Sequence, residues 1–241
     1  MIDRIMQMHN CKAFRFERLS TLSSYQLGVF ALAFMDRRDA GQQLAAKLMG
    51  YKNKNPFVLG IPRGGVVVAA EVARELGAPL DVIIPRKIGA PFNKELAVGA
   101  VAPDGTTIFD ERALFMLGLK KADLEDQVRH ELEEISRRSK TYRRDRKPPV
   151  LQGKTVILVD DGIATGMTAK AALKSVRKLD PDSLVLAVPV ASMEAVSQLN
   201  QDVDELVCLL VPDVFYAVGQ FYKDFRQTSD KEVINIMKEL A

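Results

Sequence analysis

Apolar residues along this chain follow two kinds of spacing. Five short, almost continuous apolar runs are too short for helices and rich in β-branched side chains, which predicts buried parallel strands. The runs cover residues 57–61, 80–85, 156–159, 184–190 and 206–211. Elsewhere apolar residues recur every three or four positions, which predicts helices over residues 36–49, 66–76, 169–179, 193–199 and 231–240. The alternation predicts an α/β fold: a doubly wound, mostly parallel sheet covered on both faces.

Polar residues gather where three of the predicted strands end. The loops that follow these strands cover residues 62–65, 86–89 and 160–168. In a parallel sheet, ligands bind at the carboxyl ends of the strands, near the point where the strand order reverses. We therefore expect the three loops to converge on one ligand.

Loop 160–168 reads Asp-Asp-Gly-Ile-Ala-Thr-Gly-Met-Thr and leads into a predicted helix. Such a turn directs backbone N–H groups and the positive end of the helix dipole at one point, which suits a phosphate group. Thr165 and Thr168 add hydroxyl donors, and Gly166 lets the backbone approach closely. Asp160 and Asp161 would repel a phosphate, so we expect them to face ribose hydroxyls, with a magnesium ion nearby.

An apolar strand, two acids and a Thr-Gly-x-Thr loop, in this order, resemble the 5-phosphoribosyl-1-pyrophosphate (PRPP) motif of type I phosphoribosyltransferases. The resemblance implies that Asp160 and Asp161 hold the ribose 2′- and 3′-hydroxyls and contact magnesium indirectly. It also implies that the 5′-phosphate is bound by Ala164, Thr165, Gly166, Met167 and Thr168. The alternative is a doubly wound protein whose strand merely ends on Asp-Asp, as in phospho-acceptor domains. The order of the parts favours the PRPP motif.

Two further loops match the same family. Arg63 beside Gly64 and Gly65 resembles the loop that binds pyrophosphate, and the 62–63 peptide bond is our candidate for a cis or strained bond. Arg86 and Lys87 resemble the arginine–lysine loop of adenine-type enzymes, whose cations bind pyrophosphate oxygens. Read alone, the first loop fits a tight turn and the second a solvated surface pair.

The residue Ala164 influences which acceptor base we expect. The 6-oxopurine enzymes of this family typically place an Asp before the Thr-Gly pair, where it handles a proton on the base; here the residue is Ala164. A methyl group cannot move a proton. We therefore expect an acceptor other than hypoxanthine, guanine or xanthine, and a general base, if one is needed, from elsewhere in the chain.

The C-terminal residues 212–241 are expected to form a small hood that recognises the acceptor. Five aromatic residues lie within positions 214–225, which suggests a stacking surface for a planar base. Tyr216, Val218 and Asp224 echo the acceptor site of purine-type hoods, with the acid one residue further along. Packing of these rings against the C-terminal helix is the alternative.

Residues 111–152 are expected to form a helical insertion that the family core does not need. Its main element is a long amphipathic helix predicted over 123–142, whose basic tail covers 137–147. A solvated helix end is the favoured interpretation of this tail. A mobile cover over the substrate comes second, and contact with nucleic acid is third.

Residues 1–34 differ from the rest and are expected to be poorly ordered or loosely packed. The apolar run 27–34 ends near a small-residue pattern that resembles a signal-peptidase site. We favour a non-native or misassigned extension, with Met35 as the natural start and one phosphoribosyltransferase domain over 35–241.

Composition limits the other classes of protein. A chain of 241 residues, with 47% hydrophobic and 27% charged residues, can bury the core of one enzyme-sized domain. A net charge of +3 gives no reason to expect a nucleic-acid partner. Two cysteines and two histidines exclude a disulfide framework and a zinc cluster, and no apolar run has the length of a membrane helix.

The predicted function is a cytoplasmic, PRPP-dependent phosphoribosyltransferase. A nitrogen nucleophile of unknown identity would displace pyrophosphate from ribose C1, with magnesium as the cofactor. The alternative is a regulatory module that binds PRPP without catalysis. A PRPP synthase shares the motif but needs a duplicated domain and a longer chain. The expected partners are small molecules, and a homodimer stays open.

Overall fold

A computed structural model of the protein describes residues 14–15, 33–144 and 146–240. The prediction for the extension at 1–34 therefore lies outside the described residues, apart from four positions. Two of these, Phe14 and Arg15, form the short strand β1, and the other two are Ala33 and Phe34.

The main sheet has six strands, all parallel, in the order β1-β9-β8-β7-β2-β3. Besides β1 these are β2 (Pro56–Gly60), β3 (Leu80–Val82), β7 (Thr155–Val159), β8 (Ser183–Val190) and β9 (Glu205–Leu210). From β2 the chain moves outward to β3, whereas from β7 it moves the other way through β8 to β9. The strand order therefore reverses between β2 and β7, and the doubly wound parallel sheet is confirmed.

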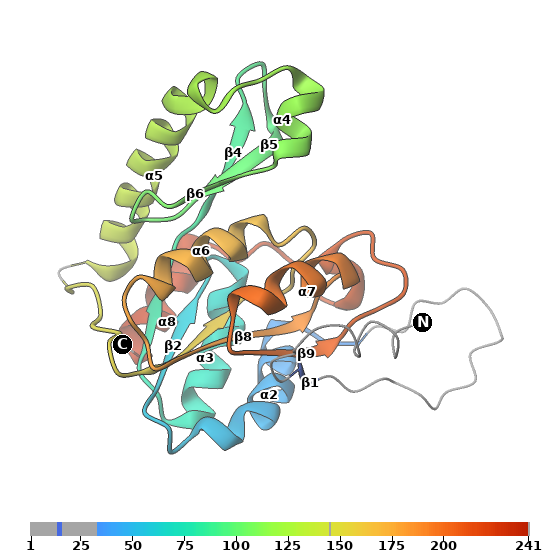
Figure 1. Ribbon diagram of the computed structural model, residues 1–241. Helices are drawn as coiled ribbons and strands as arrows, with labels where there is room; N and C mark the ends of the chain where they lie inside the picture. Colours follow the sequence, from blue (N-terminus) through green and yellow to red (C-terminus); the bar gives the residue numbers. More distant parts are fainter. Residues whose placement is uncertain (1–13, 16–32, 145, 241) are drawn as a thin grey trace.

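Helices cover both faces of this sheet (Figure 1). On one face lie α2 (Arg37–Leu48) and α3 (Gly64–Leu76), with α8 (Asp230–Leu240) beside α3; on the other lie α6 (Met167–Arg177) and α7 (Met193–Leu199). The packing of strand β7 explains why its sequence is apolar from Val156 to Val159. Val156 and Leu158 belong to the core under α6 and α7, and Ile157 and Val159 to the core under α2 and α3. A strand buried on both faces alternates between two apolar environments.

A second lobe, drawn in green in Figure 1, stands beside the main sheet. It contains an antiparallel sheet in the order β4-β5-β6, followed by two helices and a short 3-10 turn. The elements are β4 (Arg86–Ala90), β5 (Asn93–Val101), β6 (Thr107–Phe109), α4 (Glu111–Leu117), η2 (Lys121–Leu124) and α5 (Glu125–Arg143). The long amphipathic helix predicted over 123–142 is confirmed as α5.

The lobe also corrects two predictions. The excursion from the main sheet starts well before residue 111 and contains strands as well as helices. Residues 86–89, predicted to be a loop, belong to strand β4 instead. Gly89 explains part of this difference, because a Cβ there would lie 2.4 Å from the carbonyl oxygen of Lys94 on the paired strand. Glycine permits this close backbone approach, and a residue without a side chain adds nothing to an alternating strand pattern.

Both apolar and charged contacts attach the lobe to the main domain. Ala100 and Ala102 of the lobe pack against Ala171 of α6. At the end of α5, Arg143 donates from Nε to both carboxylate oxygens of Asp81, at 3.0 and 2.9 Å, and from Nη2 to the carbonyl oxygen of Val82 at 2.5 Å. These contacts fix the end of α5 against strand β3.

The predicted hood is mostly built from packed aromatic residues. Phe221 and Tyr222 are buried with Phe34, and the Tyr222 ring lies 5.2 Å from the Phe34 ring and 5.0 Å from the Phe225 ring, between centroids. The backbone N–H of Phe34 also donates to the carbonyl oxygen of Phe221 at 3.0 Å. Packing therefore accounts for most of the predicted aromatic cluster, although the partner is Phe34 rather than the C-terminal helix. Within the described ranges, no helix is long and apolar enough to cross a membrane.

Candidate active site

Two of the three predicted loops meet where the strand order reverses. Strands β2 and β7 are paired in register, Gly60 opposite Val159, so the residues that follow them lie at the same level. The N–H of Ile61 donates to the carbonyl oxygen of Val159 at 2.9 Å, which extends the pairing into the loops. The reversal point thus brings Arg63 and its glycines against the acid pair, in the position where α/β proteins bind ligands.

Gly64 and Gly65 are packed directly against the two acids. A Cβ atom on Gly64 would lie 1.9 Å from Oδ2 of Asp161, and one on Gly65 would lie 2.7 Å from Oδ1 of Asp160. No other residue fits at either position without displacing a carboxylate. The predicted approach of these glycines to an anionic ligand stays a prediction, and the structure adds that the two carboxyl side chains lie against them. The Pro62–Arg63 peptide bond is cis, as predicted.

The two carboxylates have different surroundings. Burial of the carboxyl group, and then the neighbouring charge of Asp161, raises the pKa of Asp160 well above its ordinary value. The Asp161 backbone N–H donates to Asp160 Oδ1 at 2.9 Å, which partly offsets this rise. Asp161 instead has a cationic partner, since the Nε of Arg37 lies 2.6 Å from its Oδ2. The pair is therefore set up to accept hydroxyl groups or a cation, each of which would favour the ionised form of Asp160.

Arg37 is the site residue that the sequence interpretation missed. Besides Asp161, its guanidinium contacts the carbonyl oxygen of Arg226 through Nη1 at 2.8 Å and stacks over the Phe225 ring, 3.9 Å from the centroid. Arg37 and Asp161 are 124 positions apart in the sequence, so spacing could not pair them. A cation in the first turn of a helix opposes the helix dipole, but Arg38 shares this feature, so the signal could not single out Arg37.

Replacing Arg37 with methionine is expected to destabilise the fold by about 1–3 kcal/mol, because a mostly buried carboxylate at Asp161 loses its charged partner. Chemical unfolding in urea would measure the change. Arg38→Met is the matched control, since Arg38 follows in the same helix and its guanidinium makes no contact with the acid pair. Equal stability of the two variants would contradict the structural role given to Arg37.

The predicted phosphate loop ends at the start of α6. Gly166 caps this helix with φ +77°, a left-handed conformation that favours glycine, and the helix begins at Met167. The hydroxyl of Ser192 donates to the carbonyl oxygen of Ala164 at 2.6 Å, which fixes the loop against the end of β8. Ala164 and Thr165 are exposed. The first backbone N–H groups of a helix have no partner within it, so they are available to an anion at this point.

The three predicted acceptor residues have different surroundings in the structure. Val218 packs against the acid loop, because a Cβ on Gly162 would lie 2.4 Å from its Cγ1. Tyr216 is 78% exposed and its ring is accessible to solvent. The carboxylate of Asp224 pairs instead with Arg226, at 2.9 Å from Nη1. A hood residue that was not predicted, Tyr222, donates its hydroxyl to the carbonyl oxygen of Asp161 at 2.6 Å.

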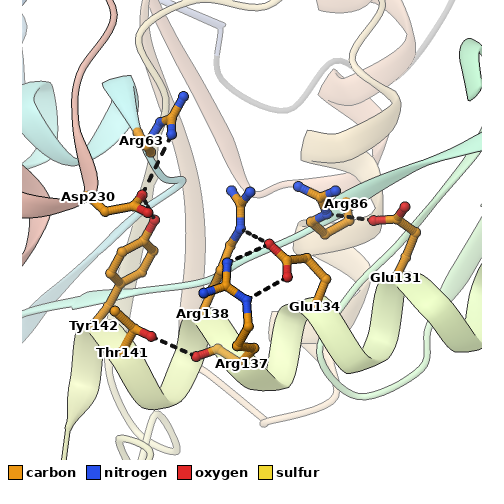
Figure 2. A network of polar contacts seen from close by, with 9 residues as sticks. All are labelled: Arg63, Arg86, Glu131, Glu134, Arg137, Arg138, Thr141, Tyr142 and Asp230. Atoms are coloured by element: carbon orange, nitrogen blue, oxygen red, sulfur yellow. Dashed lines mark hydrogen bonds and ion pairs between the residues drawn. The ribbon is translucent and has the colours of Figure 1, made fainter.

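The predicted pyrophosphate-binding cations come from separate parts of the fold (Figure 2). Arg63 follows β2 and lies 3.6 Å, through Nη1, from Oδ1 of Asp230. Arg86 lies at the start of the lobe, and its Nε is 2.5 Å from Oε2 of Glu131. Lys87 is exposed. Each arginine therefore already has a carboxylate partner.

Comparison with known proteins gives the family. The model of the phosphoribosyl transferase domain matches residues 34–226, so the chain belongs to the phosphoribosyl transferase domain family. Two Mycobacterium tuberculosis proteins named as phosphoribosyl transferases, MT0597 and Rv0571c, are each 47% identical to it over 201 residues. The match covers 83% of this chain and 45% of each relative, so the chain spans about half the length of the curated relatives it matches.

A solved structure supports the same fold. The crystal structure of the protein TT1426 from Thermus thermophilus has a TM-score of 0.73 and 45% sequence identity to this chain. The superposition covers 86% of this chain and 99% of the other. The predicted family and its doubly wound fold are confirmed.

Proposed function

We propose that the domain transfers a 5-phosphoribosyl group from PRPP to a nitrogen nucleophile and releases pyrophosphate. The observation that carries this proposal is the contact between the Gly64–Gly65 pair and the two carboxylates, at the point where the strand order reverses and beside the start of α6. A helix N-terminus for a phosphate, acids for hydroxyl groups and an arginine loop for a second anion fit the three parts of PRPP.

The proposal assigns each part of PRPP to residues of this chain. Asp160 and Asp161 hold the ribose hydroxyls, and residues 164–168 hold the 5′-phosphate. Arg63, with Gly64 and Gly65, binds the pyrophosphate end, together with Arg86 and Lys87. Phosphate and pyrophosphate lie on opposite sides of the sugar, which suits loops that come from two neighbouring strands.

Charge explains how such a site would accelerate the transfer. Departure of pyrophosphate builds positive charge on the ribose, as in glycoside cleavage, so carboxylates near the sugar stabilise the transition state. The cations stabilise the charge that develops on the leaving pyrophosphate. The protein needs no covalent nucleophile, because holding the two reactants in place supplies much of the rate.

The carboxylates fit a magnesium ion that is shared with the substrate. Among the described residues no group of three His, Cys, Asp or Glu side chains could hold a metal, and Asp161 already binds Arg37. Magnesium typically binds through one or two carboxylates together with substrate phosphates, and it keeps several waters. Asp160 and Asp161 would hold it indirectly, and when bound it neutralises charge on the pyrophosphate.

A screen for PRPP-dependent release of pyrophosphate, with magnesium and a panel of nucleobases and amines, tests the proposal. We expect turnover with an acceptor other than hypoxanthine, guanine or xanthine, because Ala164 offers no acid for those bases. Efficient turnover of hypoxanthine or guanine would contradict this acceptor assignment. PRPP binding without release of pyrophosphate in the presence of any acceptor tested would favour the regulatory module. A cytoplasmic location belongs to the proposal, since PRPP is an intracellular metabolite.

A further inference from the structure

Helix α5 presents one polar stripe to the main domain. Glu131, Glu134, Arg138 and Tyr142 are spaced so that they share one face of the helix. Tyr142 is 2% exposed and its hydroxyl donates to Oδ1 of Asp230 at 2.6 Å, so this face points into the protein. With Arg143 fixed on strand β3, the stripe has a defined orientation toward the loop that carries Arg63.

Arg138 in this stripe and Arg86 beside it each bind a carboxylate through Nε alone. Arg138 donates from Nε to Oε1 of Glu134 at 2.6 Å, and Arg86 donates from Nε to Oε2 of Glu131 at 2.5 Å. Within the part of the chain that the structure describes, the Nη atoms of both side chains donate no hydrogen bond to a protein group. Figure 2 shows the terminal nitrogens of Arg138 directed away from the axis of α5, between Arg63 and Arg86.

Contacts with arginine and tyrosine side chains lower the pKa of two carboxyl groups beside this stripe, those of Glu134 and Asp230. Hydrogen bonds from Arg137 and then Arg138 lower the pKa of Glu134 to about 2. The hydrogen bond from Tyr142, and to a lesser extent the charges of Arg63 and Arg138, lower the pKa of Asp230. Asp230 also links the two segments directly, because it contacts Arg63 at 3.6 Å and Tyr142 of α5 at 2.6 Å, and Figure 2 shows Arg138 on the same side of the helix.

We propose that α5 completes the pyrophosphate end of the site, with Arg138 as a pyrophosphate-binding residue that works beside Arg63 and Arg86. Glu134 would fix the Arg138 fork through Nε and leave its two terminal nitrogens for phosphate oxygens, a geometry that suits a multiply charged anion. This proposal rests on the proposed function and adds to it, because it gives the lobe a direct part in substrate binding.

Calorimetric titration of the full chain with inorganic pyrophosphate and magnesium chloride, and separately with ribose 5-phosphate, tests this role. Arg138→Ala is expected to weaken pyrophosphate binding about tenfold or more and to leave ribose 5-phosphate binding unchanged. Arg137→Ala is the matched control: Arg137 binds the same Glu134, but both of its contacting nitrogens face that carboxylate and its side chain is 59% exposed. Arg137→Ala should change neither ligand by more than about twofold.

Arg63→Ala separates this proposal from the proposed function. Weaker pyrophosphate binding in Arg63→Ala but not in Arg138→Ala would overturn the role of α5 and leave the proposed site in place. Unchanged pyrophosphate binding in both variants would overturn the assignment of the whole pyrophosphate end. Equal losses for both ligands in Arg138→Ala, or an equal loss in Arg137→Ala, would also overturn the proposal, because they indicate a structural or a general charge effect. Thermal unfolding of each variant checks the fold.

Discussion

Replacing Asp160 and Asp161 together with asparagine is expected to abolish PRPP binding while the fold survives. Each amide keeps the shape of the side chain but loses an ionised acceptor for a ribose hydroxyl, and two such losses weaken binding on the order of 100-fold or more. Two features should preserve the fold. The change at Asp160 removes a carboxyl group whose burial disfavours its charge, and Arg37 keeps its contacts with Phe225 and Arg226.

Calorimetric titration with PRPP and magnesium would measure this loss, and circular dichroism would check the fold. Asp182→Asn with Asp213→Asn is the matched double control, since both of these acids are exposed. The control should bind PRPP as the natural protein does. Unchanged affinity in the Asp160/Asp161 variant would rule out the ribose assignment.

Gly64→Ala is expected to reduce PRPP-dependent activity at least about 100-fold, because displacement of a binding group by about 1 Å is enough for a loss of that size. The new methyl group would lie 1.9 Å from Oδ2 of Asp161 and 2.5 Å from Nε of Arg37, so both side chains must move. The same overpacking should lower the free energy of unfolding by about 1–3 kcal/mol.

Steady-state assays and urea unfolding would measure the two effects of Gly64→Ala. The control is Gly50→Ala, because a Cβ at Gly50 meets nothing within 4 Å. It should keep full activity and equal or higher stability. Normal activity of Gly64→Ala would show that the acid pair tolerates displacement, which contradicts the geometry assigned to the site.

Most of the main domain could be predicted from apolar spacing. Strand β7 is buried on both faces, so its sequence is apolar from Val156 to Val159 and cannot be confused with an exposed segment. In helix α5 the apolar residues Val128, Leu132 and Ile135 recur at helical spacing among polar ones, so the helical period is visible in the sequence. These elements were predictable because burial alone decides their patterns.

The lobe strands could not be predicted in the same way. β4 places Arg86 and Lys87 next to Gly89, and the first four residues of β5 are exposed. Charged, small and exposed residues leave these strands little apolar alternation, so their sequence looks like a loop. The sequence of Arg86 and Lys87 therefore predicts a loop where the structure has a strand. The proximity of these two cations to pyrophosphate stays a prediction.

Contacts between side chains of distant segments could not be predicted from the sequence either. A local pattern indicates that the acids after β7 face a ligand, but it cannot show that Asp161 binds Arg37 or that Tyr222 donates to its backbone. The aromatic hood illustrates the same limit. Its composition suggested stacking on a base, whereas tertiary packing with Phe34 buries Phe221 and Tyr222 and leaves Tyr216 exposed.

The contact between Arg143 and Val82 has a consequence for how tightly the lobe depends on the main sheet. The chain leaves the parallel sheet after Val82 and comes back to the same carbonyl oxygen at Arg143, so the two ends of this long excursion are joined by one side chain. Register between β2, β3 and β7 does not depend on what lies between these two points. A change in the length of the excursion can therefore leave the parallel sheet and the acid pair in place, while it alters the cations of Arg86 and Arg138 that the excursion carries.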